Sequence, residues 1–248
     1  MFALAWYRRD ARELLLARDP VGIKPLYWWW ADGTFVFGSQ YDQVVRHRRC
    51  DRSRVDRRVL GLYLRLGFVP APYGLHEATG QVEPGHWVSV GADGRPPHRG
   101  AFRTLAVAPP PEDRLRGADA DAAVAAMVDE AVARQMVADV PVGVFLSGGI
   151  DSPLVAASMV RATTERVAAF SIGTEDPQMD ESAAATAYAQ QLGVDQHLRR
   201  ITGGDALAMI GEVAAAYPEP FGDYSSFPTL LVSALAAEQV KAVLSGDE

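Results

Sequence analysis

The stretch VGVFLSGGIDSPLVAASM (residues 142–159) decides the fold of the C-terminal half of the chain. Its first five residues, 142–146, are the short apolar run of a buried strand, and helix-forming residues begin at Ser152. The same alternation continues down the chain, with further strands expected at 167–172, 196–201 and 240–245. Apolar strands separated by helices predict an α/β domain with a doubly wound parallel sheet that is covered on both faces.

Between the first strand and its helix lies Ser147–Ser152, which we call the glycine turn. Ligands of open parallel sheets bind at the carboxyl ends of the strands, where this turn is expected. Two glycines allow close approach, successive amides form an anion-binding concavity, and a helix start favours negative charge. Asp151 would repel a phosphate unless a cation lay between them, so we interpret it as a Mg²⁺ ligand. A plain connecting turn is the alternative, but SGG-x-DS at a strand–helix junction favours phosphate binding over it.

Two common nucleotide motifs are missing from the sequence. There is no G-x-x-x-x-G-K-[ST] loop, which disfavours γ-phosphate transfer of that type. No G-x-G-x-x-G fingerprint stands between a strand and a helix, which disfavours a dinucleotide site.

The helices around this sheet are predicted from their apolar spacing. One helix should begin after Asp119 or Asp121, and another should cover 205–216. The first is expected to bury one face, made by Val124, Met127, Val128, Ala131 and Val132.

The N-terminal half is predicted to be antiparallel. Strands at 2–7 and 13–18 are followed by a hairpin around Asp32-Gly33, and Ser39 is expected to cap a helix. Further on, the patterns indicate a helix at 57–67 and a second hairpin at 84–96. A linker composition at 108–117 suggests a boundary near 110–117. We therefore divide the chain into 1–50, a connector at 51–115, and 116–248.

Composition limits the class of protein. The chain has 248 residues, is 48% hydrophobic and 22% charged, and has one cysteine, which excludes a disordered chain, a collagen and a disulfide scaffold. No apolar run is long enough for a membrane span, and the N-terminus does not resemble a signal peptide, so we expect a cytoplasmic protein. The net charge is +5 over residues 1–114 and −12 over 115–248. We interpret the arginine-rich stretch Arg46–Arg58 as a solvated surface in preference to a nucleic-acid patch.

Several segments carry a family resemblance. Ser147–Ser152 resembles the pyrophosphate loop of ATP pyrophosphatases. ARDPVGIKPLYW (17–28) resembles the end of a class II glutaminase domain, which has an N-terminal-nucleophile fold. Residues 179–197 and 219–247 resemble asparagine synthetase. These matches keep the family's order and cover most of the chain, which is thus similar to the glutamine-hydrolysing asparagine synthetases.

The resemblance implies a partial N-terminal-nucleophile antiparallel β domain followed by a PP-loop ATP pyrophosphatase domain. It implies ATP and Mg²⁺ as cofactors, formation of an aspartyl-adenylate, and displacement of AMP by ammonia. Asp151 and Asp247 would serve catalysis, with Asp151 on the metal. The residues implied at the nucleotide are Leu146, Ser147, Gly148, Gly149, Asp151, Ser152, Ile172, Ser245 and Gly246. For Leu146 and Ile172, we consider packing in the hydrophobic core at least as favoured as contact with the nucleotide.

The resemblance leaves two catalytic groups unaccounted for. The family's glutaminase nucleophile is an N-terminal cysteine, whereas this chain begins with Met1 and has only Cys50, so we predict no glutaminase activity. The only lysines are Lys24 and Lys241, and the lysine that assists adenylation is expected beyond residue 248. Together with the strand-like ends of the chain, this suggests a segment of a longer two-domain enzyme.

The remaining interpretations concern single residues and partners. We favour Asp180-Glu181 as an acidic pair stabilised by a helix start, and a structural role for His197. The resemblance implies that the loop containing Asp223 is part of the substrate pocket. Expected partners are ATP, aspartate and glutamine or ammonia, with no nucleic acid and no membrane; a homodimer is left open. Alternatives are a β-lactam synthetase-like or peptide-cyclase relative, an inactive pseudoenzyme, or a nucleic-acid-interacting protein.

Overall fold

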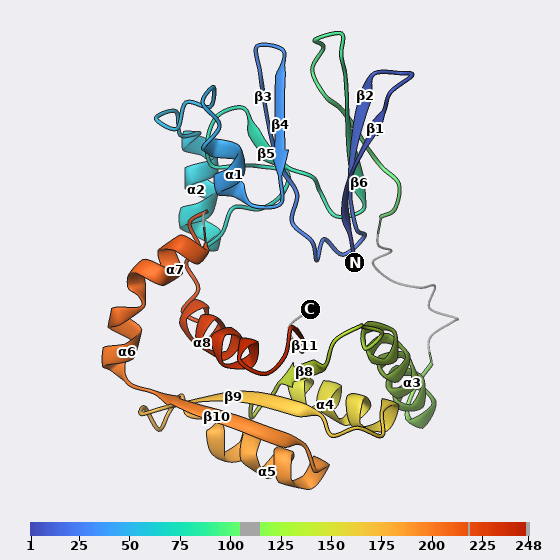
Figure 1. Ribbon diagram of the computed structural model, residues 1–248, viewed down its shortest axis with the longest axis vertical. Coiled ribbons are helices and arrows are strands. Elements are labelled where there is room, and N and C mark those ends of the chain that lie inside the picture. The colour runs from blue at the N-terminus through green and yellow to red at the C-terminus, as the bar shows by residue number, and fades with distance from the viewer. Residues whose placement is uncertain (105–114, 218, 247–248) are drawn as a thin grey trace. The chain divides into compact units, whose positions relative to one another are not determined.

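A computed structural model of the chain describes residues 1–104, 115–217 and 219–246. The chain divides into two compact units, each formed by two segments. Unit 1 comprises Met1–Ala108 and Ala214–Asp223, and unit 2 comprises Pro109–Val213 and Tyr224–Glu248 (Figure 1). The predicted linker at 108–117 and the residues Asp247 and Glu248 lie wholly or largely outside the described residues.

Unit 1 contains two antiparallel sheets, as the sequence predicts. The Asp32-Gly33 hairpin forms with φ of 48° and 69°, the left-handed values that a two-residue turn of this kind needs. Leu16, Leu26, Val82 and Val88 form the core. The sheet orders are β1-β2-β6-β7 and β4-β3-β5, with β1 (Ala3–Arg8), β2 (Glu13–Arg18), β3 (Tyr27–Ala31), β4 (Thr34–Gly38), β5 (Thr79–Gln81), β6 (His86–Gly91) and β7 (His98–Ala101).

The turn after β2 is organised by one buried carboxylate, Asp19, which is 2% exposed. It accepts backbone N–H groups from Val21, Gly22, Ile23 and Lys24, and from Phe2 before β1, at 2.8–3.2 Å. Although burial opposes ionisation, these amides hold the pKa of Asp19 down to about 2. The ARD segment is therefore structural in this unit.

Two helices accompany these sheets. α2 (Arg57–Leu66) begins where the Asp56 side chain accepts the N–H groups of Arg58 and Val59, and it ends at Gly67 in a left-handed conformation. α1 (Tyr41–Val45) starts after Gln40, which makes no side-chain cap. The expectation that Ser39 caps this helix is wrong, because the helix begins one residue too late for Ser39 to be its N-cap.

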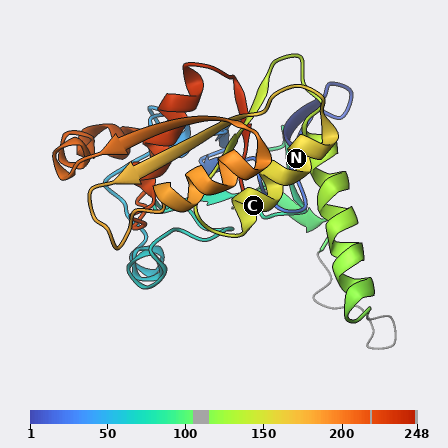
Figure 2. The same ribbon diagram turned by 90° about the horizontal axis from the view of Figure 1, so that it is seen from below.

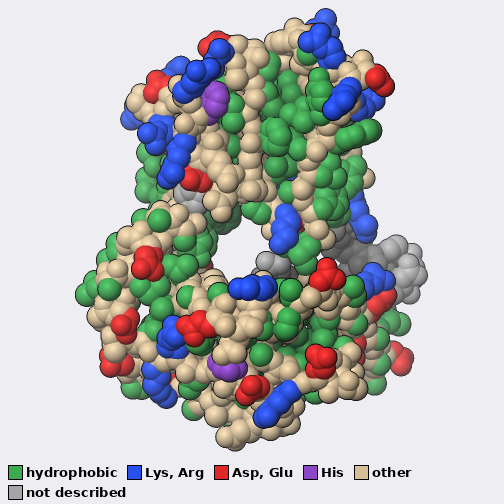
Figure 3. Space-filling view, in the orientation of Figure 1, with side chains coloured by type: hydrophobic (Ala, Val, Ile, Leu, Met, Phe, Trp, Pro, Cys, Tyr) green, Lys and Arg blue, Asp and Glu red, His purple; other side chains and the backbone are tan. Residues whose placement is uncertain are grey.

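Apolar side chains lie exposed on one face of the β1-β2-β6-β7 sheet. Phe2, Leu4, Trp6 and Phe102 are 38–57% exposed. They line a cavity of about 520 Å³ together with residues of β2 and β6. Figure 3 shows hydrophobic side chains gathered over the strands of unit 1.

Unit 2 is built on one parallel sheet with the order β10-β9-β8-β11. The strands are β8 (Val142–Phe145), β9 (Ala168–Thr174), β10 (Asp195–Ile201) and β11 (Ala242–Leu244). Successive side chains of one strand pack on opposite faces, since Val144 belongs to one core cluster and the neighbouring Phe145 packs against the other. The predicted parallel sheet is confirmed.

Helices cover both faces of this sheet. α4 (Asp151–Ala162) and α5 (Ser182–Leu192) pack on one face, and α8 (Ser226–Ala237) packs on the other (Figure 2). Gly193 ends α5 in a left-handed conformation, with a φ of 68°. The fold is therefore doubly wound.

The remaining helices correct two expectations. α3 (Ala118–Gln135) packs mainly on α4, through a narrow stripe that includes Val128 and Val132. Val124 and Met127 are 58% and 69% exposed, so the wider apolar face predicted for this helix is wrong; Ala131 is exposed as well.

The helix predicted at 205–216 is two helices, α6 (Gly203–Ala208) and α7 (Ile210–Ala216). A capping box at Thr202 and Asp205 starts α6 early. The helix then tightens at Met209, whose N–H is shared by the carbonyls of Asp205 and Ala206. Within the described residues, no helix is both long enough and apolar enough to cross a membrane.

Candidate functional site

The strand order of unit 2 fixes where a ligand can enter. β8 is the first strand of the sheet, β9 and β10 extend it on one side, and β11 pairs on the other, with Leu244 opposite Val144. The strand order therefore reverses between β8 and β11, and open α/β sheets bind ligands at such a point, beyond the carboxyl ends of the strands. The loops that follow β8 and β11 meet there.

The glycine turn after β8 is held by its two serines. The Ser147 amide donates to Ser152 Oγ at 2.9 Å, and the two hydroxyl oxygens are also 2.9 Å apart. The Gly149 amide donates to Ser147 Oγ at 3.2 Å. Ser147 and Ser152 thus fix a compact turn whose far end becomes the first turn of α4, where helix amides lack partners within the helix.

Gly246, which follows β11, lies directly against the start of α4. A Cβ at this position would be 2.7 Å from the Ser152 nitrogen and 2.8 Å from the Asp151 carbonyl carbon. Only glycine permits this approach without a shift of backbone. The structure therefore brings Ser245-Gly246 and the glycine turn together, although about a hundred residues separate them in sequence.

Leu146 and Ile172 contribute side chains to the cores. Leu146 is 3% exposed, its amide donates to the Phe170 carbonyl at 2.9 Å, and its carbonyl accepts the Ser171 hydroxyl at 2.8 Å. Ile172 packs near α8, two residues before β9 ends. These contacts favour core packing, and contact of either residue with adenosine stays a prediction.

Asp151 is the first residue of α4 and is exposed. Its carboxylate and the neighbouring serine hydroxyls are oxygen donors of the kind that Mg²⁺ prefers. Within the described parts of the chain, no group of three His, Cys, Asp or Glu side chains could hold a metal by itself. This donor set fits Mg²⁺ because that ion is usually held by one or two carboxylates together with water and substrate phosphates. Asp247, the second acidic residue predicted at the site, lies outside the described residues.

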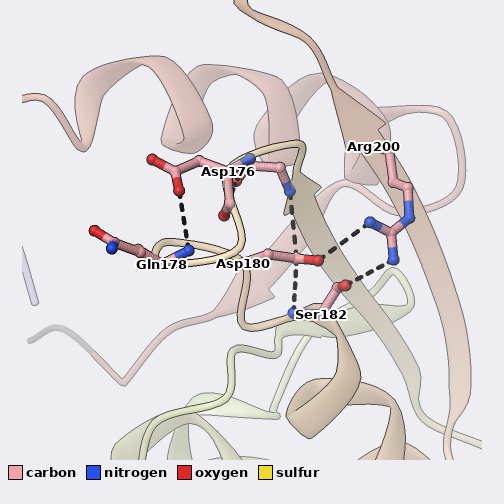
Figure 4. A network of polar contacts seen from close by, with 6 residues as sticks. Asp176, Gln178, Asp180, Ser182 and Arg200 are labelled. Carbon is pink, nitrogen blue, oxygen red and sulfur yellow. Dashed lines mark hydrogen bonds and ion pairs between the residues drawn. The ribbon is translucent and has the colours of Figure 1, made fainter.

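A polar network fixes the loop between β9 and α5 (Figure 4). Asp180 accepts the amides of Ser182 and Thr174 at 3.0 and 3.3 Å and forms an ion pair with Arg200 of β10 at 3.1 Å. Arg200 also donates to Ser182 Oγ at 3.1 Å. Hydrogen bonding from Ser182 is the main reason that the pKa of Asp180 falls to about 2.

Glu181, the next residue, reaches the glycine turn. Its Oε2 accepts the Gly148 N–H at 3.0 Å, and it makes no side-chain cap on α5. The sequence favoured a purely helix-stabilising role for Asp180-Glu181, and nothing in the spacing of Glu181 and Gly148 indicates this contact. Only the parallel packing of β8 beside β9 brings them together.

A second perturbed carboxyl, which the sequence did not single out, lies in unit 1. Glu219 Oε2 is 3.4 Å from Gln81 Nε2, and Oε1 is buried without a hydrogen-bond partner. Burial raises the pKa of Glu219 to about 7, an increase that the nearby Leu75 backbone and Tyr27 hydroxyl only partly offset. Its one sequence signal is a carboxylate between two prolines, Pro218 and Pro220.

The other singled-out residues have ordinary surroundings. His197 stacks on Phe170 with ring centroids 5.2 Å apart, which supports its structural interpretation. Burial and Asp51 raise the pKa of the Cys50 thiol, although Arg52 opposes them, so the nearby cations do not activate it. Asp223 is exposed.

The arginine-rich stretch Arg46–Arg58 has anionic partners nearby. Arg46 pairs with Asp42, Arg54 with Glu77 and Arg58 with Asp56. These pairs lie at the surface, as the solvated interpretation expects.

Comparison with known proteins identifies relatives over the whole chain. A Methanocaldococcus jannaschii protein provisionally named as a glutamine-hydrolysing asparagine synthetase is 30% identical over the full chain, which covers 48% of that protein. Asparagine synthetase (glutamine-hydrolysing) 1 of Bacillus subtilis is 29% identical, and the chain covers 38% of it. Amidase chyE of Penicillium rubens is 30% identical over 99% of the chain and 38% of its own length. The chain thus spans less than half the length of these relatives.

Among solved structures, an NH₃-dependent NAD synthetase from Campylobacter jejuni matches 49% of this chain and 54% of its own chain, at 18% identity and a TM-score of 0.34. Two family descriptions match the sequence directly. Residues 1–99 match the glutamine amidotransferase domain, and residues 123–247 match asparagine synthase. The chain therefore belongs to the asparagine synthase family.

Proposed function

We propose that this chain carries the nucleotide-binding part of a glutamine-dependent amide ligase that uses ATP to activate a carboxylate, with aspartate as the acyl substrate. One observation carries the proposal: Gly246 lies so close to the start of α4 that a Cβ added to it would be 2.7 Å from the Ser152 nitrogen. This joins the two strand-end loops at the point where the strand order reverses. Family membership supports the reaction class.

In the proposed reaction, a carboxylate oxygen of aspartate attacks the α-phosphorus of ATP. The bond from that phosphorus to the bridging oxygen breaks, and pyrophosphate leaves. The acyl-adenylate then reacts with ammonia, whose nitrogen attacks the acyl carbon; AMP leaves, and the nitrogen releases a proton to give the amide. Adenylation is needed because a bare carboxylate has no good leaving group.

The residues of the glycine turn would act by binding and orienting the pyrophosphate part of ATP. Ser147 and Ser152 hold the turn in shape, and the first amides of α4 face the charge at the positive end of the helix dipole. Asp151 would hold Mg²⁺ together with phosphate oxygens, and the ion would neutralise charge on the departing pyrophosphate. Ser245 and Gly246 would close the site from the β11 side.

Ammonia would come from outside this chain or from solution. Cys50 is its only thiol, and burial and Asp51 raise the pKa of that thiol, which leaves it a poor nucleophile. We expect no release of glutamate from glutamine above background. Measurable glutaminase activity of the purified chain would contradict this part of the proposal.

A second candidate keeps the same ATP chemistry with another acyl substrate. The relative named as an amidase favours it, because that protein matches the chain as extensively as the asparagine synthetases do. Exchange of labelled pyrophosphate into ATP separates the two, since exchange requires the carboxylate that is adenylated. Dependence on aspartate supports the first candidate, and dependence on a different acid supports the second.

The binding part of the proposal is tested by calorimetry with Mg-ATP. We expect the wild-type chain to bind and Asp151→Ala to weaken binding by about tenfold or more, the loss of one close charge–metal contact. Asp119→Ala is the matched control, because it removes an exposed carboxylate from the first turn of α3. Equal affinity of the Asp151 variant and the control would refute the assignment of the turn.

A further inference from the structure

We propose that Glu181 acts as a specificity residue of the glycine turn, because its carboxylate occupies a phosphate-binding amide and so selects cation-complexed pyrophosphate over the free anion. This inference rests on the proposed function. It assigns a role to a residue that touches the turn from another strand–helix unit.

The contact itself is that of an anion with a phosphate-binding turn. Glu181 Oε2 accepts the Gly148 N–H at 3.0 Å. Gly148 is one of the two central glycines of a turn whose amides can bind anions. The amide of the other, Gly149, already donates to Ser147 Oγ at 3.2 Å, so the Gly148 amide is the one for which a phosphate would have to displace Glu181. A carboxylate oxygen and a phosphate oxygen are both anionic acceptors of such an amide, so they compete for it.

The backbone of Glu181 is held close to the turn. A Cβ on Gly148 would lie 2.9 Å from the Glu181 Cβ, so the two main chains approach closely. On either side, Asp180 and Ser182 are tied to Arg200 and to the end of β9. Glu181 can therefore leave the amide only by rotating its side chain, and its charge stays beside the site.

Two carboxylates belong to the immediate surroundings of this turn, because Asp151 is part of it and Glu181 contacts it. None of the ion pairs among the described residues includes either of them. A metal-free pyrophosphate meets both the repulsion of Glu181 and the loss of its hydrogen bond. A divalent cation between the phosphates and the carboxylates offsets that repulsion, so the penalty falls mainly on the free anion.

The test compares inorganic pyrophosphate with and without Mg²⁺ in calorimetry on the full 248-residue chain. Glu181→Gln keeps the shape of the side chain and removes its charge. Glu181→Ala also removes the oxygen that accepts the Gly148 N–H. Glu175→Gln is the matched control, because it neutralises an exposed glutamate in the same β9–α5 loop. Circular dichroism verifies that each variant is folded.

For wild type, we expect tighter binding with Mg²⁺ than without it. In both Glu181 variants, we expect the ratio of the metal-free to the Mg²⁺ dissociation constant to fall by more than about threefold, as removal of one screened charge near a polyanion requires. The ratio should stay unchanged in Glu175→Gln. A ratio within about threefold of wild type in the Glu181 variants would overturn this inference while leaving the proposed function standing. Failure of wild type to bind pyrophosphate under both conditions would overturn both.

Discussion

Replacement of Glu219 by glutamine should stabilise unit 1 at alkaline pH and leave its stability nearly unchanged at acid pH. Glu219 is partly buried in this unit, with one carboxyl oxygen unpartnered, and burial raises its pKa from 4.5 to about 7. The folded unit therefore prefers the protonated, neutral carboxyl. Glutamine is neutral at every pH and has nearly the same shape.

The sign and size of this stability change follow from the difference between the folded and unfolded pKa of Glu219. Because the folded pKa lies above the unfolded one, the favourable contribution of the neutral carboxyl is complete below pH 4.5 and is lost as pH rises through about 7. At about 1.36 kcal/mol for each unit by which the folded pKa exceeds the unfolded one, the full difference is about 3 kcal/mol, and residual solvent contact reduces it toward about 2 kcal/mol. Glu219→Gln should remove this loss.

Urea unfolding monitored by tryptophan fluorescence measures the unfolding free energy of unit 1, where Glu219 lies. All five tryptophans lie in segments of unit 1: Trp6, Trp28, Trp29, Trp30 and Trp87. The gain in unfolding free energy of the variant over wild type should be near zero at pH 4.5 and about 2–3 kcal/mol at pH 8. Asp10→Asn, which neutralises an exposed carboxylate in the β1–β2 turn of unit 1, is the control and should show no such trend. Parallel pH profiles of wild type and Glu219→Gln would refute the reasoning.

Three further predictions concern other positions. Asp19→Asn should cost about 3 kcal/mol of unfolding free energy at pH 7, because the amide cannot replace a carboxylate that accepts five N–H groups; a urea midpoint equal to wild type would contradict this. Gly246→Ala should weaken Mg-ATP binding, since the added Cβ lies 2.7 Å from the Ser152 nitrogen, whereas Gly211→Ala, whose Cβ meets no atom within 4 Å, should bind normally in the same calorimetric assay. The Cys50 thiol should react with a disulfide reagent at pH 8 more slowly than a free cysteine, because burial and Asp51 raise its pKa; labelling at the free rate would rule out that environment.

The parallel sheet and its glycine turn could be predicted because local signals specify both. A short apolar strand, two glycines and a helix start all lie within residues 142–159, and they need no distant partner to be recognised. The Asp32-Gly33 hairpin is equally local, because one dipeptide supplies both left-handed φ values.

The features that could not be predicted from the sequence depend on packing between distant segments. The buried face of α3 is narrower than its apolar pattern, because the helix packs on α4, so Met127 is left exposed. Glu181 and Gly148 come together only through the pairing of β8 with β9. The raised pKa of Glu219 likewise requires knowledge of what buries it. The division of the chain into residues 1–50, 51–115 and 116–248, and the nucleotide-binding roles of single residues, stay predictions.

The pairing of β8 with β11 has a consequence for how the molecule reaches its native state. The glycine turn can form from local residues, but its counterpart, Gly246, follows a strand that pairs with β8 across a long stretch of chain. Such distant parallel pairing is slow compared with local helix and hairpin formation, because a large loop must close first. During synthesis, the edge of β8 that later pairs with β11 stays unpaired while β9 and β10 emerge from the ribosome. A nucleotide that bridges both loops would hold the last strand in place, so ATP should slow the release of β11 in hydrogen-exchange experiments.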